Sequence, residues 1–306
     1  MPAKPINRYS GALALCCFVI ASGCVTDPVS LPVTAPPHSE WVKSCTDWDE
    51  WDKPGPPFRI FGNSYYVGTC GITAILVTGD KGHILIDGST EAGADIIATN
   101  IQSLGFSLKD VKILLHSHEH LDHVGGLAKL QQLSGARLLA SAEAAPVLET
   151  GIAADKDPQV GLHKPFPAAQ VNGIVRGGET VKLAKLALTP IATPGHTAGA
   201  LSWQWQSCEG ERCLSIVYAD SLSPMSNDSY HFSDHPVYLK NYRVGLDKLT
   251  ALDCSILLSP HPSLVNMRGR LSVAGGLVDT GSCKAFSKAS STRLNQRLTN
   301  EQAGHN

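Results

Sequence analysis

The segment His118-Glu119-His120-Leu121-Asp122-His123 places four side chains that can bind a metal within six residues. The apolar run Val111–Leu115 before it predicts a short buried strand, and a helix is expected over about residues 125–133. Imidazole and carboxylate groups at the end of a buried strand lose hydration unless they gain a partner. Zinc accepts both kinds of ligand, at about 2.0–2.2 Å. The segment therefore predicts a zinc site, and the alternative interpretation is a solvated polar loop.

The spacing within this segment predicts how its side chains divide. Alternate side chains of an extended chain face the same way, so His118 and His120 can reach one metal together. Asp122 and His123 belong to the turn into the next helix, which can direct them at a second metal. His116 shares the alternation but lies further back along the strand, and we interpret it as a neighbour rather than a ligand.

Two later histidines stand in turns that follow apolar strands. His196 lies in Thr193-Pro194-Gly195-His196-Thr197, and His261 lies in Leu258-Ser259-Pro260-His261-Pro262. A single histidine in such a place is more often structural than a ligand. Their occurrence together with the first cluster makes both candidates for the missing ligands.

The hydrophobic pattern around these motifs predicts one domain with two sheets packed together and helices outside, an αββα sandwich. Strands are expected over residues 58–61, 64–67, 73–78, 83–86, 111–115, 137–140, 180–182, 186–192, 200–205 and 214–219. Helices are expected over about 92–104, 125–133, 142–148, 239–252 and 284–298. Residues 153–173 show no hydrophobic periodicity, which predicts a long surface loop of the kind that often borders an active site.

The N-terminus is typical of a signal peptide over residues 1–23. Lys4 and Arg8 precede the apolar run Gly11–Ile20, which is too short to span a bilayer, and small residues stand before Cys24. Cys24 either becomes a lipidated mature N-terminus or follows an ordinary cleavage site. We expect residues 24–57 to be a Pro-rich leader and residues 58–306 to be the catalytic domain.

Charge and cysteine content restrict the classes of function. The chain has 25 basic and 27 acidic residues without long runs of either sign. This balance disfavours a nucleic-acid-binding surface and favours a small substrate. Six cysteines remain after Cys24, an even number that favours disulfides in an exported protein over free thiols or a cysteine metal site. Of the 15 connectivities open to six cysteines, sequence neighbourhood favours Cys45–Cys70, Cys208–Cys213 and Cys254–Cys283.

Over residues 58–262 these motifs resemble the metallo-β-lactamase superfamily. Leu85-Ile86-Asp87-Gly88 resembles its first motif, in which the Asp supports the metal loop, although an ordinary Asp-Gly turn has the same pattern. Ala219-Asp220-Ser221-Leu222-Ser223 is similar to subclass B3, as are Ser229-Tyr230, Phe232-Ser233-Asp234-His235-Pro236 and the disulfides Cys208–Cys213 and Cys254–Cys283. A cysteine-ligand subclass would have Cys at position 221, and a mono-zinc subclass would lack His118.

The resemblance implies a hydrolase with two zinc ions per subunit that share a bridging hydroxide and lie about 3.5–4 Å apart. The first zinc would be held by His118, His120 and His196, and the second by Asp122, His123 and His261. The hydroxide would open the β-lactam ring of penicillins, cephalosporins and carbapenems, with Asp122 orienting it. Ser221, Ser223 and Gln159 would bind the substrate, and Asp87 and Asp220 would support the ligands.

The resemblance further implies a monomeric periplasmic enzyme of a Gram-negative bacterium that confers antibiotic resistance. Other members of the superfamily hydrolyse thioesters, lactones or phosphodiesters with almost the same ligands. In the glyoxalase-like branch an Asp in the place of Asp220 bridges both metals, but the export signal and the 45 residues after His261 disfavour that branch. A non-enzymatic zinc-binding protein is disfavoured because all six ligands are present.

Overall fold

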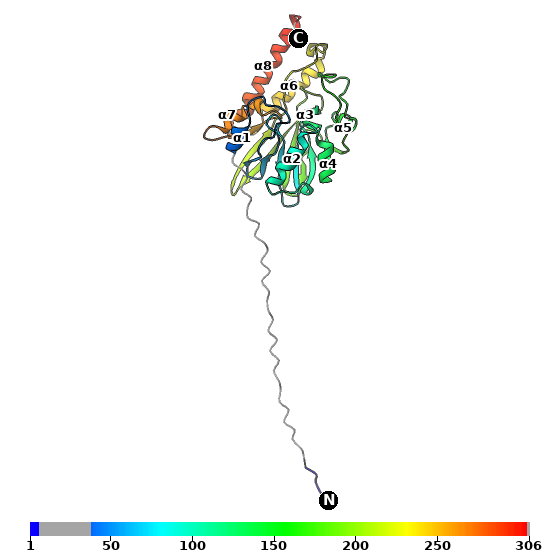
Figure 1. Ribbon diagram of the computed structural model, residues 1–306, viewed down its shortest axis with the longest axis vertical. Coiled ribbons are helices and arrows are strands. Elements are labelled where there is room, and N and C mark those ends of the chain that lie inside the picture. The colour runs from blue at the N-terminus through cyan, green and yellow to red at the C-terminus, as the bar shows by residue number, and fades with distance from the viewer. Residues whose placement is uncertain (6–37, 305–306) are drawn as a thin grey trace. The chain divides into compact units, whose positions relative to one another are not determined.

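The computed structural model describes residues 1–5 and 38–304 (Figure 1). The expected signal peptide, apart from residues 1–5, and Cys24 therefore lie outside the described residues. Among the described residues, no helix combines the length and the apolar content that crossing a bilayer requires.

Two mixed sheets form the centre of the fold. The first has the order β1-β2-β3-β4-β5-β6-β7, and the second has the order β12-β11-β10-β9-β8. The strands of the first sheet are β1 (Phe58–Phe61), β2 (Ser64–Tyr66), β3 (Ile75–Val77), β4 (His83–Ile86), β5 (Val111–Leu115), β6 (Arg137–Ala140) and β7 (Val171–Ile174). Those of the second are β8 (Val181–Leu183), β9 (Leu186–Ala192), β10 (Leu201–Glu209), β11 (Arg212–Tyr218) and β12 (Ile256–Leu258).

Helices cover the outer faces of both sheets. The α-helices are α1 (His38–Ser44), α2 (Gly93–Ser103), α3 (Leu121–Val124), α4 (Leu127–Ser134), α5 (Ala145–Thr150), α6 (Pro236–Thr250), α7 (Met267–Leu271) and α8 (Ser282–Gln302). Three short 3-10 helices are η1 (Leu108–Asp110), η2 (Phe232–Asp234) and η3 (Pro262–Val265). Helices α2 and α4 contact each other, and α6 packs along α8 (Figure 1).

Strand β4 shows how the layers are held together. Its side chains alternate, so that Ile84 and Ile86 join the apolar cluster shared with the second sheet, including Trp203 and Ile216. Leu85 points the other way, into the cluster formed with helices α2 and α4. A strand buried on both faces has a continuous apolar sequence, as His83–Ile86 nearly has. The αββα sandwich predicted from the sequence is confirmed.

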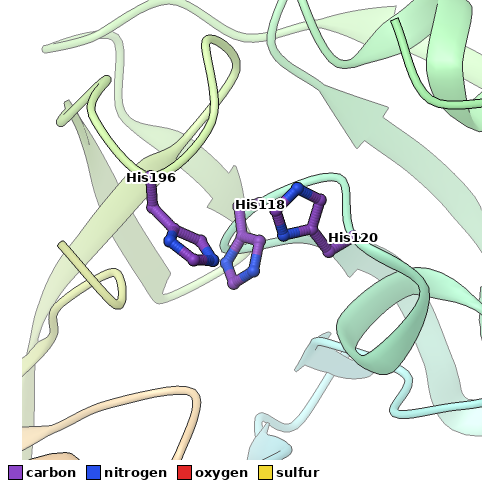
Figure 2. A group of neighbouring side chains, drawn as sticks. All are labelled: His118, His120 and His196. Atoms are coloured by element: carbon purple, nitrogen blue, oxygen red, sulfur yellow. The ribbon is translucent and has the colours of Figure 1, made fainter. Parts of the chain in front are cut away.

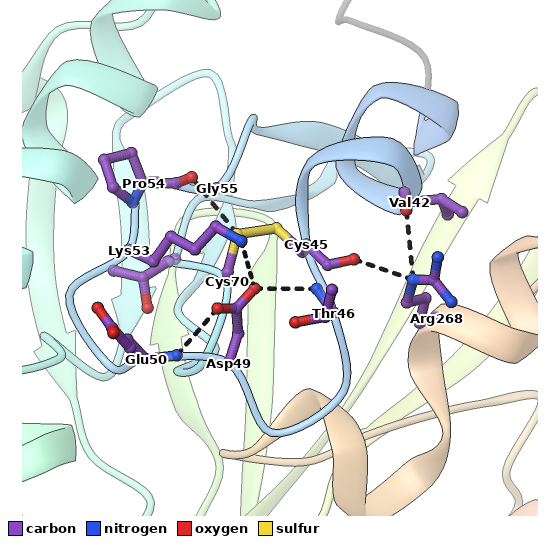
Figure 3. Close-up of a disulfide and its surroundings, with 12 residues drawn as sticks. Val42, Cys45, Thr46, Asp49, Glu50, Lys53, Pro54, Gly55, Cys70 and Arg268 are labelled. Atoms are coloured by element: carbon purple, nitrogen blue, oxygen red, sulfur yellow. Dashed lines mark hydrogen bonds and ion pairs between the residues drawn. A yellow bond between two sulfur atoms is a disulfide. The ribbon is translucent and has the colours of Figure 1, made fainter.

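The compact domain begins before residue 58, which corrects the predicted leader over residues 24–57. Helix α1 contacts β1 and α7, and Trp41 is buried. The disulfide Cys45–Cys70 ties the segment after α1 to the first sheet (Figure 3), and the Arg268 side chain donates to the Cys45 carbonyl at 2.9 Å. The first four prolines of the stretch precede α1, whereas Trp41 and Cys45 supply apolar contacts after them.

Two other expectations about the elements need correction. Residues 171–174 form the edge strand β7 instead of the end of a long loop, because pairing with β6 supplies their hydrogen bonds. The helix expected over about residues 125–133 is present as α4, which begins two residues later, and the short helix α3 precedes it. All three disulfides favoured by the sequence are present, including Cys208–Cys213 across the hairpin of β10 and β11.

Candidate metal centre

The candidate ligands come from both sheets and meet at one edge. Strands β4 and β5 are parallel, as are β11 and β12, so in each pair the carboxyl ends lie together. The segments that follow these ends carry Asp87, His118, Asp220 and His261, and His196 follows the end of β9. Residues far apart in the sequence are thereby gathered because each lies just beyond a strand.

The first group comprises His118, His120 and His196, whose ligand atoms lie within 4.8 Å of one another. All three imidazoles are buried, and Figure 2 shows the ring of His118 lying between the other two. Nδ1 of His196 lies 2.9 Å from the Ser223 carbonyl oxygen and can donate to it, which leaves Nε2 for a metal. The buried Nε2 of His118 has no hydrogen-bond partner among the described residues. A buried ring nitrogen without a partner is costly unless it binds an ion.

The second group comprises His118, Asp122 and His123, again within 4.8 Å. Oδ2 of Asp122 lies 2.9 Å from Nε2 of His123 and 3.3 Å from Nε2 of His261. Neither ring nitrogen of His123 makes a hydrogen bond of acceptable geometry within the described part of the chain. Ligand atoms that lie this close without hydrogen-bonding to one another are arranged as they would be around a shared cation. His261 lies at the edge of this group, within 3.3 Å of Asp122.

The electrostatic surroundings favour the neutral form of two histidines. Burial and the neighbouring imidazoles hold the pKa of His118 well below its usual range, and burial with His120 lowers the pKa of His196 to about 3. Burial would raise the pKa of Asp122, but His123 outweighs it and keeps the carboxyl ionised. Neutral His118 and His196 and ionised Asp122 are the forms that bind zinc. Burial would lower the pKa values of His120 and His123, but Asp157 and Asp122, respectively, outweigh it and raise them. The nitrogen and oxygen donors therefore fit zinc.

Asp87 lies beneath the loop that carries the first ligands. Its carboxylate accepts from the Ser117 backbone N–H at 2.6 Å, from the Ser117 hydroxyl at 2.7 Å and from the Tyr218 hydroxyl at 2.7 Å. Its backbone has a φ of 65°, a left-handed conformation that costs energy for a residue with a side chain. The bonds to Ser117 fix the start of the ligand segment, residues 118–123. Oδ2 of Asp87 also lies 3.7 Å from Nδ1 of His123.

Asp220 lies behind His118 rather than between the two groups. Its fully buried Oδ1 is 2.8 Å from Nδ1 of His118, on the side of the ring away from the unpartnered Nε2, and among the described residues it makes no hydrogen bond of acceptable geometry. A carboxylate in this place orients a metal-binding imidazole. His116 lies apart from both groups: its Nε2 accepts from the Ser141 backbone N–H at 3.1 Å, which links β5 to the segment after β6.

Sequence reasoning missed two buried carboxylates that hold the ligand loops. Glu119 accepts from the Thr197 hydroxyl at 2.7 Å and from the Gly199 backbone N–H at 2.9 Å, so it joins the metal loop to the loop of His196. Asp157 lies 3.2 Å from Nε2 of His120 through both oxygens. Glu119 gave no signal beyond its place between two histidines, and Asp157 stands only two residues before Gln159.

The metal centre lies in a cleft of about 720 Å³. Trp48 and Trp51 line it from the segment pinned by Cys45–Cys70, and Met225 lines it from the segment after Ser223. Of the expected substrate-binding residues, all three line the cleft: Gln159, Ser221 and Ser223. Nε2 of Gln159 lies 3.3 Å from Nε2 of His196, and the buried Ser221 hydroxyl has no partner among the described residues. The tryptophans, Met225 and Arg293 were not predicted to line it.

Comparisons with known proteins agree with this architecture. Residues 67–209 match the family model described as the metallo-β-lactamase superfamily. A curated hydroxyacylglutathione hydrolase of Bradyrhizobium sp. strain BTAi1 is 30% identical over 40% of this chain, and the match spans only 42% of that relative's length.

Solved structures match over nearly their whole length. The MIM-2 metallo-β-lactamase is 57% identical, with 88% of this chain and 99% of that chain covered and a TM-score of 0.84. BJP-1, a subclass B3 metallo-β-lactamase of Bradyrhizobium japonicum, is 30% identical, with 84% and 98% covered and a TM-score of 0.76. By this likeness across the whole fold, the chain belongs to the metallo-β-lactamase superfamily and, within it, to subclass B3.

Proposed function

We propose that the protein is a zinc-dependent β-lactamase that hydrolyses the cyclic amide of penicillins, cephalosporins and carbapenems. The observation that carries the proposal is the pair of ligand groups that share His118, with His120, His196 and Asp122 lining one cleft. The likeness to the MIM-2 metallo-β-lactamase supports the choice of bond.

The donor sets would hold two zinc ions. His118, His120 and His196 would bind one of them. Asp122, His123 and His261 would bind the other, since Asp122 lies within 3.3 Å of both imidazoles. Zinc bound in these sites supplies a Lewis acid and a water whose pKa is lowered towards neutrality.

Asp122 is the residue placed to handle the proton of the attacking water. Its carboxylate is buried, remains ionised and belongs to the second ligand group, which shares His118 with the first. It can therefore orient the nucleophile as well as serve as a ligand, and it can accept a proton.

Three polar side chains would position the substrate. Ser221 and Ser223 follow β11 and line the cleft beside His196, and Gln159 lines it from the loop before β7. Hydroxyl and amide groups can donate to the carboxylate and the carbonyl groups of a β-lactam.

A thioesterase or lactonase is the alternative, supported by the partial match to hydroxyacylglutathione hydrolases. The position of Asp220 disfavours it. Its carboxylate contacts Nδ1 of His118, whereas a bridging carboxylate would have to face the atoms that both ligand groups share.

We also propose export to the periplasm, where the enzyme would act as a monomer and confer antibiotic resistance. The charged, apolar and small residues up to Cys24 support export, as do the three disulfides. Fractionation of cells and mass spectrometry of the mature N-terminus would separate lipidation at Cys24 from ordinary cleavage. A mature protein that retains Lys4 and Arg8 in the cytoplasm would contradict export.

A substrate panel tests the proposed activity. The purified zinc-loaded protein is assayed against a penicillin, a carbapenem, a glutathione thioester and an acyl lactone. We expect turnover of both β-lactams, and Asp122→Asn should lose most of it, while His38→Asn, an exposed change at the start of α1, should not. Hydrolysis of the thioester or lactone with neither β-lactam would contradict the proposal.

A further inference from the structure

Two chain segments line the cleft and contact the imidazole of His196. Gln159 lines it from the Gln159 segment, residues 154–164, and Ser223 lines it from the segment after β11. The Ser223 carbonyl oxygen lies 2.9 Å from Nδ1 of His196, and Nε2 of Gln159 lies 3.3 Å from Nε2 of the same ring. The placement of the two segments relative to each other therefore sets the shape of the cleft around a candidate metal ligand.

The Gln159 segment has few bonds to the rest of the fold. Residues 154–164 form turns without a helix or strand, closed by local bonds such as that from the Leu162 N–H to the Gln159 carbonyl at 3.0 Å. Among the described residues, the hydrogen bonds that leave this segment go to His120, His196 and Asn227. The two histidines are candidate metal ligands, so Asn227 is the partner outside the metal centre.

Asn227 joins the two segments through its backbone and its side chain. Its backbone N–H donates to the Pro158 carbonyl at 2.8 Å, and its side-chain Nδ2 donates to the Val160 carbonyl at 3.0 Å. Its side-chain oxygen accepts from the backbone N–H and the hydroxyl of Ser229 at 2.9 and 2.8 Å. The orientation of the amide is fixed, because a backbone N–H can only donate and a carbonyl can only accept. The nitrogen holds the neighbouring segment, and the oxygen closes a turn in its own.

The segment that carries Asn227 is itself anchored on helix α8. Arg297 donates to the Ser226 hydroxyl at 2.7 Å and to the Tyr230 carbonyl at 3.1 Å, and it pairs with Glu301 at 2.8 Å. The Ser226 hydroxyl donates in turn to the Asn227 carbonyl at 2.9 Å. Asn227 therefore connects a segment held by a long helix to a segment with few bonds of its own.

We propose that Asn227 is a positioning residue that holds the Gln159 segment against the segment after β11 and thereby places Gln159 for the substrate. The role of Gln159 towards a substrate rests on the proposed function, whereas the link between the segments rests on the contacts of Asn227 themselves. Loss of the side-chain bond leaves a single backbone bond, to Pro158, on the side away from the metal ligands. The Gln159 segment should then open more often.

Two substitutions separate the link from the turn. Asn227→Asp keeps an acceptor for Ser229 but, when ionised, cannot donate to the Val160 carbonyl. Asn227→Ser keeps a hydroxyl that can accept from the Ser229 N–H but is too short to replace the amide nitrogen. Ser229→Ala, an exposed change, is the matched control, because it removes a bond to the same Asn227 side chain and leaves the donor to Val160 in place.

Hydrogen exchange followed by mass spectrometry measures the opening of residues 154–164 in the zinc-loaded protein without turnover. In Asn227→Asp and Asn227→Ser, amide exchange in this segment should be about 3- to 10-fold faster, as expected when a local opening loses one hydrogen bond. Exchange in strands β9 and β10 should not change. Ser229→Ala should exchange like the unchanged protein throughout.

Kinetics test the positioning of Gln159. For a penicillin, both Asn227 variants should raise KM about 3- to 10-fold with little change in kcat, because Gln159 is proposed to bind the substrate equally in the ground and transition states. Ser229→Ala should change neither constant. A side chain that only stabilises the fold would lower the melting temperature and leave the KM of the folded enzyme unchanged.

Unchanged exchange of residues 154–164 in both Asn227 variants would overturn the link between the segments. Faster exchange throughout the domain with a lowered melting temperature, or faster local exchange with an unchanged KM, would overturn the positioning role. The exchange result is independent of turnover, so failure of the unchanged protein to hydrolyse any β-lactam, which would contradict the proposed function, is distinguishable from failure of the Asn227 link.

Discussion

Both carboxylate oxygens of Asp157 lie 3.2 Å from Nε2 of His120, and the same carboxylate accepts from the Gln159 backbone N–H at 2.6 Å. One side chain therefore joins a candidate metal ligand to the loop that carries a candidate substrate-binding residue. By orienting His120, Asp157 leaves Nδ1 of that ring for the metal.

Asp157→Asn should weaken zinc binding by about 10- to 100-fold, because a carboxylate behind a metal-binding imidazole raises its basicity and fixes its orientation. Competition with a chromophoric chelator measures the affinity. Asp155→Asn, an exposed change in the same loop, is the matched control. Unchanged zinc affinity in Asp157→Asn would show that the contact does not support the metal.

The disulfide Cys45–Cys70 should stabilise the protein more than Cys208–Cys213. The two bonds join cysteines 25 and 5 residues apart, and the loop-closure relation gives about 3.5 and about 2 kcal/mol, respectively. Urea denaturation of the metal-free double Cys→Ser variants measures both losses. A larger loss for the Cys208–Cys213 pair would contradict this order.

The first of these bonds also bears on the site, because it anchors the segment that Figure 3 shows after Cys45. The segment that follows Cys45 is folded by Asp49, which accepts from the Thr46 backbone N–H and pairs with Lys53 at 2.7 Å. Trp48 and Trp51 belong to this segment and line the cleft. Loss of the disulfide should therefore change tryptophan fluorescence even under native conditions.

Glu301 should make stability depend on pH in the acid range. Its side chain accepts from the backbone N–H groups of Phe232 and Ser233 at 2.9 Å and pairs with Arg297. Burial would raise the pKa of Glu301, but Arg297 and the two N–H groups outweigh it and hold the pKa below its usual range. Because the folded pKa is depressed, the stabilisation is complete above the ordinary glutamate pKa of about 4.3 and is lost as pH falls through the folded value.

Glu301→Gln should therefore lower the free energy of unfolding by about 1.5–3 kcal/mol at pH 7. The difference from the unchanged protein should shrink as the pH falls below about 4.3. Denaturation of metal-free protein from pH 7 to 3 measures it, with exposed Glu211→Gln as the control. A difference that stays constant over this range would exclude Glu301 as the titrating group.

The sequence predicts the central elements of this fold because their apolar residues are local signals. Residues 83–86, 111–115, 137–140 and 186–192 form strands with the predicted bounds. Strand β7, with the sequence Val-Asn-Gly-Ile, lacks such a signal and exists because β6 offers it a partner. The leader predicted over residues 24–57 rests on prolines that precede residue 38, whereas the packing of Trp41, which joins the segment from residue 38 to the domain, has no local signal.

The residues of the site also fall into those that the local sequence predicts and those that it does not. Most candidate ligands stand just after a strand, and Asp122 and His123 lie in the short helix α3 that follows β5, so the structure gathers residues that the spacing already predicts. Arg293, Trp48 and Asp157 reach the cleft through tertiary packing, and nothing in their neighbours distinguishes them from exposed residues. Arg293 in particular stands in a helix with a largely polar sequence.

The most direct test of the account is the rate of penicillin hydrolysis before and after metal removal. We predict that the purified protein hydrolyses a penicillin, that dialysis against a chelator abolishes the reaction, and that zinc restores it. Restoration should be complete when two zinc ions are bound per chain. Absence of penicillin hydrolysis in the fully zinc-loaded protein, or hydrolysis that survives removal of the metal, would contradict the account.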